Sequence, residues 1–231
     1  MQIRTEHDQR TERRRPITTV LVDEESLMRD VLSRALSADG LAVIGEAANG
    51  EDAMTIVLDL RPDVVVIDLR LPGISGIETI RQIGLQAPAS RILVLTRGDE
   101  NRVVEAIVAG ASGYILKSAE PTLIIGAVRK TAGGECVLSP TIAGRLLERI
   151  REREIPIAAA GTSAASIRAA LTVRELEIFE RLASGESNQQ IGLALALSRN
   201  TISNHIASIL AKLHLDNRVQ AAVQAVRSGI S

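Results

Sequence analysis

The stretch "VVVIDLRLPGISG", residues 64–76, places a carboxylate where a buried strand ends. Four apolar residues lead directly into Asp68, and a Pro-Gly turn follows soon after it. A short strand that is apolar throughout is typical of a parallel sheet with both faces covered. A carboxylate at the end of such a strand is costly unless it is paired or used. The role of Asp68 therefore depends on what the other strands bring to the same edge.

Outward from this stretch, short apolar runs alternate with helical patterns. The expected strands cover residues 17–22, 41–47, 63–68, 91–96 and 112–116. The expected helices begin near Glu25, Asn49, Ser75, Glu100 and Ala119. This alternation predicts an α/β, doubly wound fold, in which a five-stranded parallel sheet of order 2-1-3-4-5 has helices on both faces.

Ligands of such sheets bind beyond the carboxyl ends of the strands. Five polar residues lie at those ends: Asp23, Glu24, Asp68, Thr96 and Lys117. Any one of them alone could simply cap the following turn. Because the first and third strands are neighbours, however, the three carboxylates form one cluster, and two carboxylates about 5 Å apart repel by roughly 3 kcal/mol at an effective dielectric constant of about 20. The cluster predicts a divalent cation with only oxygen ligands, Mg²⁺ or Mn²⁺, and Lys117 as a fixed counter-charge.

Four segments, "VLVDEE" (20–25), "VVVIDLRLPGISG" (64–76), "ILVLT" (92–96) and "GYILK" (113–117), resemble the receiver domain of two-component response regulators. The resemblance covers residues 17–136. It implies that Asp68 is the phosphoacceptor and that a cognate histidine kinase supplies the phosphoryl group. It also implies the metal ligands Asp23, Glu24, Asp68 and the backbone carbonyl of Arg70, the phosphoryl-binding residues Thr96 and Lys117, and the switch residues Thr96 and Tyr114.

Two positions depart from the pattern of that family. Glu24 stands where an aspartate is commoner. Arg97 follows Thr96, where a smaller or uncharged residue is more usual. Arg97 is either a solvated surface side chain or a lid that alters access to Asp68, and hence the lifetime of the phosphoryl group.

The segment from Leu171 onward has the pattern of a small all-helical domain, residues 171–231. Its first helix opens at Thr172, where Glu175 completes a capping box, and ends at Gly185. Three further helices are expected in "SNQQIGLALAL" (187–197), "SRNTISNHIASILAKL" (198–213) and "DNRVQAAVQAVRSG" (216–229). A helix, a tight turn and a second helix form the motif that places one helix in the major groove of DNA.

The tail resembles the LuxR-type helix-turn-helix, on residues that include Leu171, Thr172, Glu175, Gly185, Ser198, Ile202, His205 and Leu213. With the receiver in front, the whole chain resembles a NarL/FixJ-type response regulator, a transcription factor. The resemblance implies that the third helix, about 198–212, is the recognition helix, and that the fourth supplies a dimer contact. The residues expected to face DNA are Arg199, Asn200, Thr201, Ser203, Asn204 and Lys212. A homodimer, formed when phosphorylated, matches a site with inverted half-sites. His205 is expected to pack against the protein rather than to contact bases.

The weak basic charge of the tail keeps a second interpretation open. Residues 168–231 hold seven basic and five acidic side chains, a net charge of +2, which is small for a DNA-binding domain. The alternative is a phosphorelay or interaction protein whose tail binds a protein partner, or binds DNA only weakly. A third class, a phosphatase with an aspartate nucleophile, is disfavoured because Arg70 stands where that chemistry needs an acid/base aspartate. We therefore expect a protein that is not an enzyme.

Composition and the flanking segments complete the expectations. The chain has 231 residues, a net charge of −1 and a single cysteine, Cys136. Because no apolar run approaches the roughly 18 residues of a membrane span, we expect a cytoplasmic protein with no membrane contact. Residues 1–16 are predicted to be a disordered leader, with a basic arm that touches nucleic acid as the minority alternative. Residues 137–170 are predicted to hold a helix striped by Ile142, Leu146 and Ile150, followed by a flexible linker at 156–168.

Overall fold

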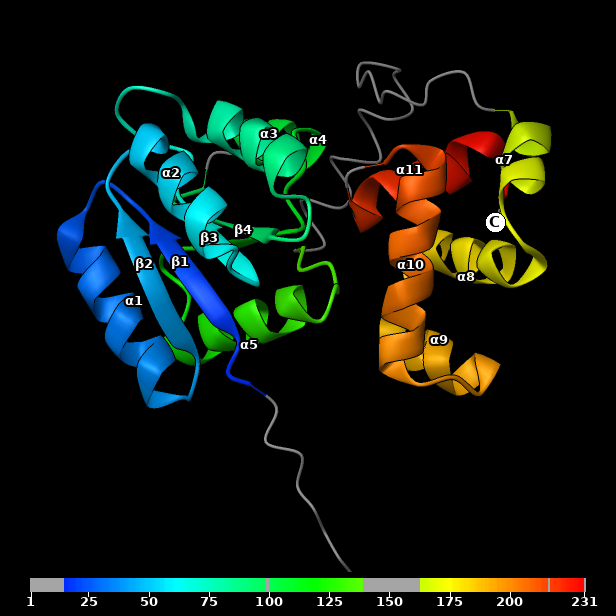
Figure 1. Ribbon diagram of the computed structural model, residues 1–231, viewed down its shortest axis with the longest axis horizontal. Coiled ribbons are helices and arrows are strands. Elements are labelled where there is room, and N and C mark those ends of the chain that lie inside the picture. The colour runs from blue at the N-terminus through cyan, green and yellow to red at the C-terminus, as the bar shows by residue number, and fades with distance from the viewer. Residues whose placement is uncertain (1–14, 99, 139–162, 216, 231) are drawn as a thin grey trace, which may run out of the picture.

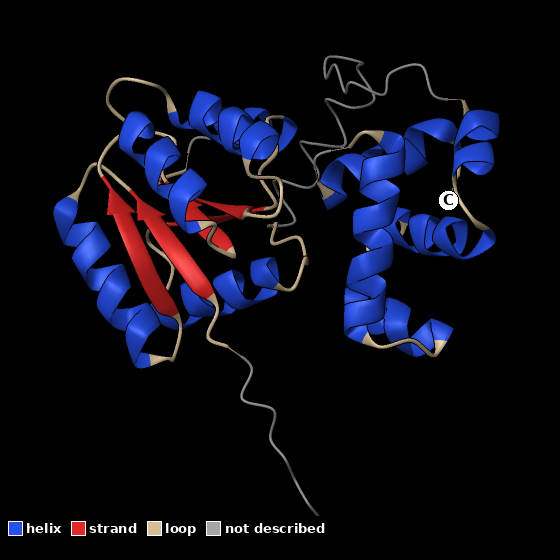
Figure 2. Cartoon of the chain, in the orientation of Figure 1, coloured by secondary structure: helices blue, strands red, loops and turns tan. Residues whose placement is uncertain are grey.

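A computed structural model describes residues 15–98, 100–138, 163–215 and 217–230. Its N-terminal part is a sheet between two layers of helices, and its C-terminal part is all helical (Figures 1 and 2). The strands are β1 (Thr18–Val22), β2 (Ala42–Ala47), β3 (Val64–Ile67), β4 (Arg91–Thr96) and β5 (Gly113–Leu116). They pair in parallel in the order β2-β1-β3-β4-β5, which confirms the predicted fold class and strand order.

Helices cover both faces of the sheet, so side chains of β3 are buried on either side. The helices of the sheet unit are α1 (Ser26–Ala38), α2 (Gly50–Leu60), α3 (Gly76–Gln86), α4 (Glu100–Val108) and α5 (Pro121–Ala132). One core layer contains Val66 of β3 with Leu36 of α1 and Val128 of α5. On the other face, Val65 and Ile67 lie in a core cluster with residues of α2, α3 and α4. The side chains of Asn49 and Ser75 cap α2 and α3 by accepting hydrogen bonds from the amides of Asp52 and Glu78.

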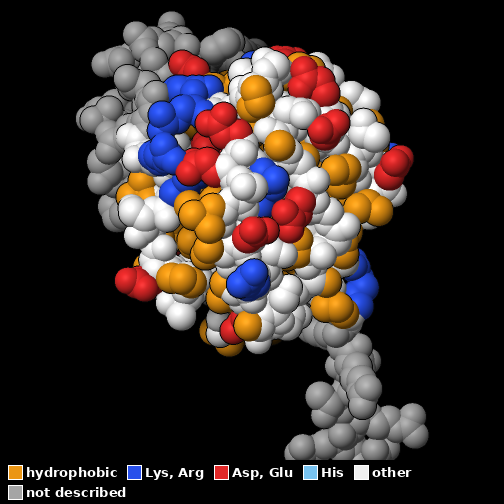
Figure 3. All heavy atoms as spheres, turned by 90° about the vertical axis from the view of Figure 1, so that its left-hand side faces the viewer, with side chains coloured by type: hydrophobic (Ala, Val, Ile, Leu, Met, Phe, Trp, Pro, Cys, Tyr) orange, Lys and Arg blue, Asp and Glu red, His pale blue; other side chains and the backbone are white. Residues whose placement is uncertain are grey.

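The surface of the sheet unit carries charges of both signs. Figure 3 shows the side of this unit on which α1 and β2 lie, and there acidic and basic side chains are interspersed with apolar ones. Leu27 and Val31 of α1 are among the exposed apolar residues, with 74% and 49% of their surface accessible. The mixture of charges agrees with the net charge of −1 for the chain.

The tail contains α7 (Ala164–Ala170), α8 (Val173–Ala183), α9 (Asn188–Leu195), α10 (Arg199–Leu213) and α11 (Arg218–Ser228). Its core is apolar, with Phe179 of α8 and Ile202 of α10 fully buried. The predicted capping box of Thr172 and Glu175 is present at the start of α8. The longest of these helices, α10, has 15 residues, and no helix in the described ranges combines the length and apolar character needed to cross a bilayer.

Residues 163–170 differ from the prediction. The flexible linker predicted at 156–168 is wrong at its end, because Ser163 caps α7 and Ile167 is fully buried against the tail. A helix of 7 residues with one buried apolar position leaves almost no periodic signal in the sequence. The helix predicted around Ile142, Leu146 and Ile150 lies outside the described residues, as does nearly all of the predicted leader.

The turn between α9 and α10 depends on a glycine. A Cβ atom at Gly192 would lie 2.7 Å from the carbonyl oxygen of Leu197, closer than such atoms approach. Ala196 adopts a left-handed conformation, with φ of 54°, and ends α9 immediately before this contact. Glycine within a helix costs about 1 kcal/mol relative to alanine, but here only glycine allows the tight turn.

Candidate functional site

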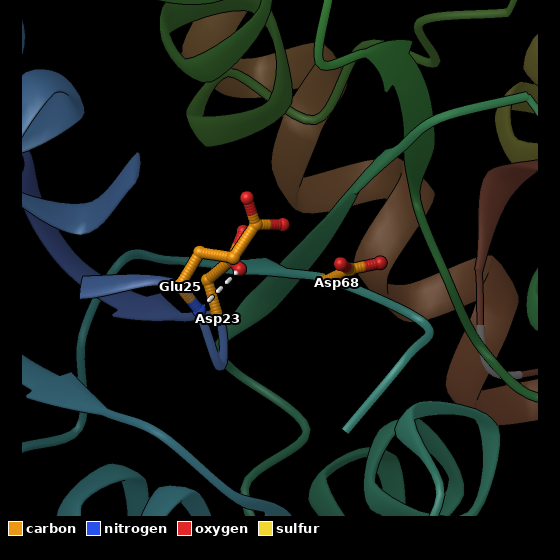
Figure 4. A group of neighbouring side chains, drawn as sticks. All are labelled: Asp23, Glu25 and Asp68. Atoms are coloured by element: carbon orange, nitrogen blue, oxygen red, sulfur yellow. Dashed lines mark hydrogen bonds between the residues drawn. The ribbon is translucent and has the colours of Figure 1, made fainter. Parts of the chain in front are cut away.

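Two buried carboxylates lie side by side where β1 and β3 end. Val22 and Ile67 are paired in the register of these strands, so the residues that follow them, Asp23 and Asp68, are neighbours. The amide of Asp68 donates to the carbonyl oxygen of Val22 at 2.9 Å, which continues the ladder to the edge. Only 2% of Asp23 and 3% of Asp68 are exposed. Figure 4 shows both side chains at this edge of the sheet.

Lys117 connects the two carboxylates. It follows β5, and its amide donates to the carbonyl oxygen of Thr96 at 2.8 Å. Its Nζ lies 2.6 Å from Oδ2 of Asp23 and 2.6 Å from Oδ2 of Asp68. The lysine side chain is 4% exposed, so the ammonium group can remain charged only because both carboxylates surround it.

The pKa values at this edge reflect burial and pairing. Burial raises the pKa of the Asp23 carboxyl above its ordinary value, although hydrogen bonds from Lys117 and from the amide of Glu25 act in the opposite direction. Burial alone would lower the pKa of Lys117, but hydrogen bonds to Asp23 and Asp68 outweigh it and raise that pKa. Lys117 is therefore a fixed positive charge beside Asp68.

The third carboxylate of the cluster is Glu25 and not Glu24. Glu24, which the sequence pattern predicts as a metal ligand, is exposed to solvent. The amide of Glu25 donates to Oδ1 of Asp23 at 3.0 Å, and this turn directs the Glu25 carboxylate to the site (Figure 4). Oε1 of Glu25 lies 3.2 Å from Nζ of Lys117.

The cluster has the chemistry of a site for a hard divalent cation. One oxygen from each of Asp23, Glu25 and Asp68 lies within 4.8 Å of the others. The hydrogen bond from Lys117 lowers the pKa of Glu25, so that this carboxylate is ionised at neutral pH. Carboxylate oxygens are the ligands that Mg²⁺ and Mn²⁺ prefer, and the residues therefore fit such a cation. Arg70 lines the site with its backbone, because its amide donates to Oδ1 of Asp68 at 3.1 Å.

The remaining predicted residues of this site lie on β4 and β5. Thr96 is the last residue of β4 and is 2% exposed. Tyr114, on β5, is 6% exposed, so its side chain already lies in the core. A switch at Tyr114 therefore cannot consist of burying an exposed ring. Arg97, the residue after Thr96, forms an ion pair with Glu25.

In the tail, Glu175 joins the start of α8 to α10. Its Oε2 accepts hydrogen bonds from the amide and the hydroxyl of Thr172, at 2.8 and 2.9 Å. The hydroxyl of Ser208 donates to its Oε1 at 2.7 Å, and Nζ of Lys212 lies 2.6 Å from its Oε2. Lys212, predicted to face DNA, therefore holds the structure of the tail together.

The third helix of the tail, α10, faces the sheet unit along part of its length (Figure 1). Nδ2 of Asn188 donates to the carbonyl oxygen of Gly133 at 3.1 Å and to Oγ of Ser203 at 3.1 Å. A cavity of about 260 Å³ lies between the two parts, lined by residues of α10 that include Ser203 and Leu210. Of the other positions predicted to contact DNA, Asn200 and Asn204 are exposed, Thr201 is half-buried, and the side chain of Arg199 lies outside the described part. His205 is half-buried, as expected for a packed residue.

The fourth helix, α11, also contacts the sheet unit. Nδ2 of Asn217 donates to the carbonyl oxygen of Ile107 at 3.1 Å, and Nε2 of Gln220 donates to that of Val108 at 3.1 Å. Both carbonyls belong to the last turn of α4, where the final carbonyl groups have no partner further along the helix. The carbonyl oxygen of Ile107 also accepts from the amide of Gly110, at 3.1 Å. The closed contact is the name used below for the hydrogen bonds of Asn217 and Gln220 together with those that Asn188 and Ser203 donate to the carbonyl oxygen of Gly133.

Comparisons with known proteins agree with both halves of the geometry. The family model "Response regulator receiver domain" matches residues 19–129, and "Bacterial regulatory proteins, luxR family" matches residues 169–225. The transcriptional regulatory protein LiaR of Bacillus subtilis is 36% identical over 217 residues, which cover 92% of this chain and 98% of LiaR. The chain is a response regulator. The nitrate/nitrite response regulator protein homolog of Haemophilus influenzae is 33% identical over 209 residues, 90% of this chain and 95% of that protein.

Solved structures of response regulators share this fold. A LuxR-family response regulator from Aurantimonas matches with a TM-score of 0.54 and 35% identity, covering 60% of this chain and 99% of that one. The receiver domain of NarL from Mycobacterium tuberculosis matches with a TM-score of 0.51 and 31% identity, over 53% of this chain and all of that one. This response regulator therefore has a receiver domain with an acidic pocket and a LuxR-type helix-turn-helix domain, in a family of transcriptional regulators.

A first prediction concerns the role of Lys212 inside the response regulator. Burial alone would raise the pKa of Glu175, but hydrogen bonds from Lys212, Ser208 and Thr172 lower it from 4.5 to about 2. Because the folded-state pKa is below the ordinary value, this carboxylate stabilises the tail above pH 4.5, and the stabilisation is lost as the pH falls toward 2. We expect Lys212→Met to destabilise the tail by about 2 kcal/mol at neutral pH and to move acid unfolding to higher pH.

Hydrogen exchange measured by mass spectrometry can test this in the full chain. Amides of α8 and α10 should exchange roughly 30-fold faster in Lys212→Met, while those of the receiver sheet should not change. Lys130→Met, which removes an exposed lysine from α5, is the matched control and should leave α8 and α10 as they are. If the amides of α8 and α10 exchange at the same rate in Lys212→Met as in the parent chain, Lys212 does not stabilise the tail and remains available to contact DNA.

Proposed function

We propose that this response regulator is switched by phosphorylation of Asp68, and that its helical tail then binds DNA to regulate transcription. The observation that best supports this function is the buried Asp68 carboxylate. Nζ of Lys117 lies 2.6 Å from it and 2.6 Å from the Asp23 carboxylate, and so bridges the two. A site whose carboxylates are buried and which is provided with a fixed cation is suited to phosphoryl transfer.

The chemistry follows from the positions of the side chains. A carboxylate oxygen of Asp68 attacks phosphorus, the bond from phosphorus to the donor's histidine nitrogen breaks, and an acyl phosphate forms. The ammonium of Lys117 pairs with a phosphoryl oxygen, and the hydroxyl of Thr96 donates to another. A divalent cation held by Asp23, Glu25 and Asp68 supplies neutralising charge for the incoming group. We assign Mg²⁺ or Mn²⁺ to this role, with a histidine kinase as the phosphodonor.

The closed contact supports a specific form of regulation. A B-DNA major groove about 12 Å wide accepts one helix of about 10–12 Å diameter, so α10 cannot occupy the groove while it packs against the receiver. Phosphorylation is proposed to shift the balance from this closed form to one in which α10 and α11 are free. Because a ligand shifts only an existing equilibrium, some open protein exists without phosphate. The open form is proposed to dimerise and to bind inverted half-sites.

A gel shift with genomic fragments, with and without a small acyl-phosphate donor, tests this function. Binding that strengthens with the donor supports it. If no fragment binds in either state while Asp68 still takes label, the tail serves a protein partner instead. That second candidate is favoured by the tail's net charge of +2 and by the position of Ser203, which faces Gly133 in the closed contact.

A second prediction tests whether α10 enters the groove. Ser203→Lys adds one positive charge per subunit on the face of α10 proposed to meet DNA. Each added phosphate contact steepens the dependence of log affinity on log salt by about 0.9, so a dimer should gain nearly 2 in slope. The measurement uses protein treated with phosphodonor, because the new side chain also disturbs the contact with Gly133.

The control is Ser184→Lys, which adds the same charge at an exposed position after α8. It should change the slope much less. If Ser203→Lys leaves affinity and slope as in the parent, α10 does not lie in the groove. Substitutions at Asn200 and Asn204 should change which sequence is preferred, because side-chain amides pair with adenine.

A further inference from the structure

The ion pair between Arg97 and Glu25 lies at the mouth of the receiver site. Oε1 of Glu25 is the atom that the Arg97 guanidinium contacts, and the same oxygen lies 3.2 Å from Nζ of Lys117. Lys117 in turn touches Asp68 at 2.6 Å. A single oxygen of Glu25 therefore lies between Arg97 and Lys117, the lysine that contacts Asp68.

The pair is built so that one partner is fixed and the other is free to move. Glu25 is held by its backbone, whose amide donates to Oδ1 of Asp23, and by Lys117. The Arg97 side chain is 54% exposed, against 37% for Glu25. Among the described residues, Arg97 forms its ion pair with Glu25, and ion pairs at that exposure hold weakly.

We propose that Arg97 is a second phosphoryl-binding cation, held by Glu25 until the site is loaded. The inference rests on the proposed function of Asp68. Glu25 is shared between two uses, since its carboxylate can pair with Arg97 or contribute to a divalent cation. A cation held by Glu25 would weaken the attraction of this carboxylate for Arg97 and leave the guanidinium free to pair with a phosphoryl group on Asp68.

Charge and shape both favour a phosphoryl group as the new partner. With a divalent cation bound and Asp68 carrying a dianionic phosphoryl group, the charges of Asp23, Glu25, Asp68, Lys117 and Arg97 balance only if Arg97 is counted. The planar guanidinium offers two parallel N–H donors to two oxygens of one phosphoryl group, which an ammonium cannot do. Lys117 would then donate to the buried side of the phosphoryl group, and Arg97 to its solvent-exposed side.

Calorimetric titration of the full chain tests this with two probes, Mg²⁺ alone and beryllofluoride in saturating Mg²⁺ as a stable mimic of the phosphoryl group. In Arg97→Ala, beryllofluoride should bind about tenfold more weakly, because a charge-assisted contact is lost. Mg²⁺ alone should bind severalfold more tightly, because Glu25 has lost its competing partner. A residue with only a structural role would move both constants in the same direction. Arg97→Lys should recover part of the beryllofluoride affinity.

Arg81→Ala is the matched control, because Arg81 also pairs with a glutamate, Glu78, at the surface of α3. It should change neither constant. If Arg97→Ala binds beryllofluoride as tightly as the parent, the inference is wrong while the proposed function stands. If the parent chain itself binds no beryllofluoride in Mg²⁺, the proposed function of Asp68 fails, and the inference fails with it.

Discussion

Asp68→Asn should take up no phosphoryl group from a small acyl-phosphate donor, whereas the parent chain takes up one. The expected loss is complete because the amide of asparagine is not a nucleophile toward phosphorus under these conditions, and Asp68 is the carboxylate that Lys117 and the amide of Arg70 both contact. Intact-mass spectrometry after a short incubation with Mg²⁺ measures the label directly. Chelation of the divalent cation should suppress labelling of the parent chain as well.

The matched control is Asp59→Asn, at an exposed aspartate of α2. This variant should be labelled like the parent chain. Label on the Asp68→Asn protein would assign the phosphoacceptor to another residue. It would also remove the main support for the proposed switch, although the family and the fold would be unaffected.

Asn217→Asp should raise DNA affinity by roughly fivefold or more in the absence of phosphodonor. In the closed contact the amide of Asn217 donates to the carbonyl oxygen of Ile107. A carboxylate cannot donate, and its charge faces that oxygen in a buried position, so the closed form is destabilised by about 1–3 kcal/mol. The side-chain oxygen that caps α11 by accepting from the amide of Gln220 is retained, so the tail itself stays folded.

The added negative charge would by itself weaken binding to DNA, which makes an increase diagnostic. Gln190→Glu places the same charge at an exposed position of the tail, where glutamate also satisfies the capping box with Ser187. This control should bind slightly less tightly than the parent. If Asn217→Asp and Gln190→Glu behave alike, the closed contact does not restrain α10. Adding phosphodonor should raise the DNA affinity of the parent chain close to that of Asn217→Asp.

The sequence predicts the sheet and the positions of Asp23, Asp68 and Lys117 because those features are local and regular. An apolar run ends, a polar residue follows, and parallel strands bring all such residues to one edge. Glu25 was missed because the direction of a side chain just beyond a strand is decided by the turn. Here the hydrogen bond from the Glu25 amide to Asp23 turns Glu25 inward and Glu24 outward. Arg97, an unexpected positive charge directly after β4, is the signal that could have pointed to Glu25.

The tail shows the same division between local and distant contacts. Its four main helices and the Thr172 capping box follow from caps and spacing within the segment. The partner of Lys212 is 37 residues away on another helix, and the contact of Ser203 with Gly133 spans 70 residues. No local pattern encodes such pairs, so residues predicted to face DNA were found in contact with protein.

The nearly complete absence of aromatic residues gives the protein a built-in optical label. The chain has one tyrosine, one phenylalanine and no tryptophan, and the tyrosine is Tyr114, buried on β5 three residues before Lys117. At wavelengths where tyrosine absorbs and phenylalanine does not, absorbance and emission therefore originate from one ring in the receiver domain, on the strand that leads to Lys117, without background from Phe179 of the tail. Events at Asp68 can be followed in the unmodified chain by stopped-flow fluorescence, with no dye and no engineered residue.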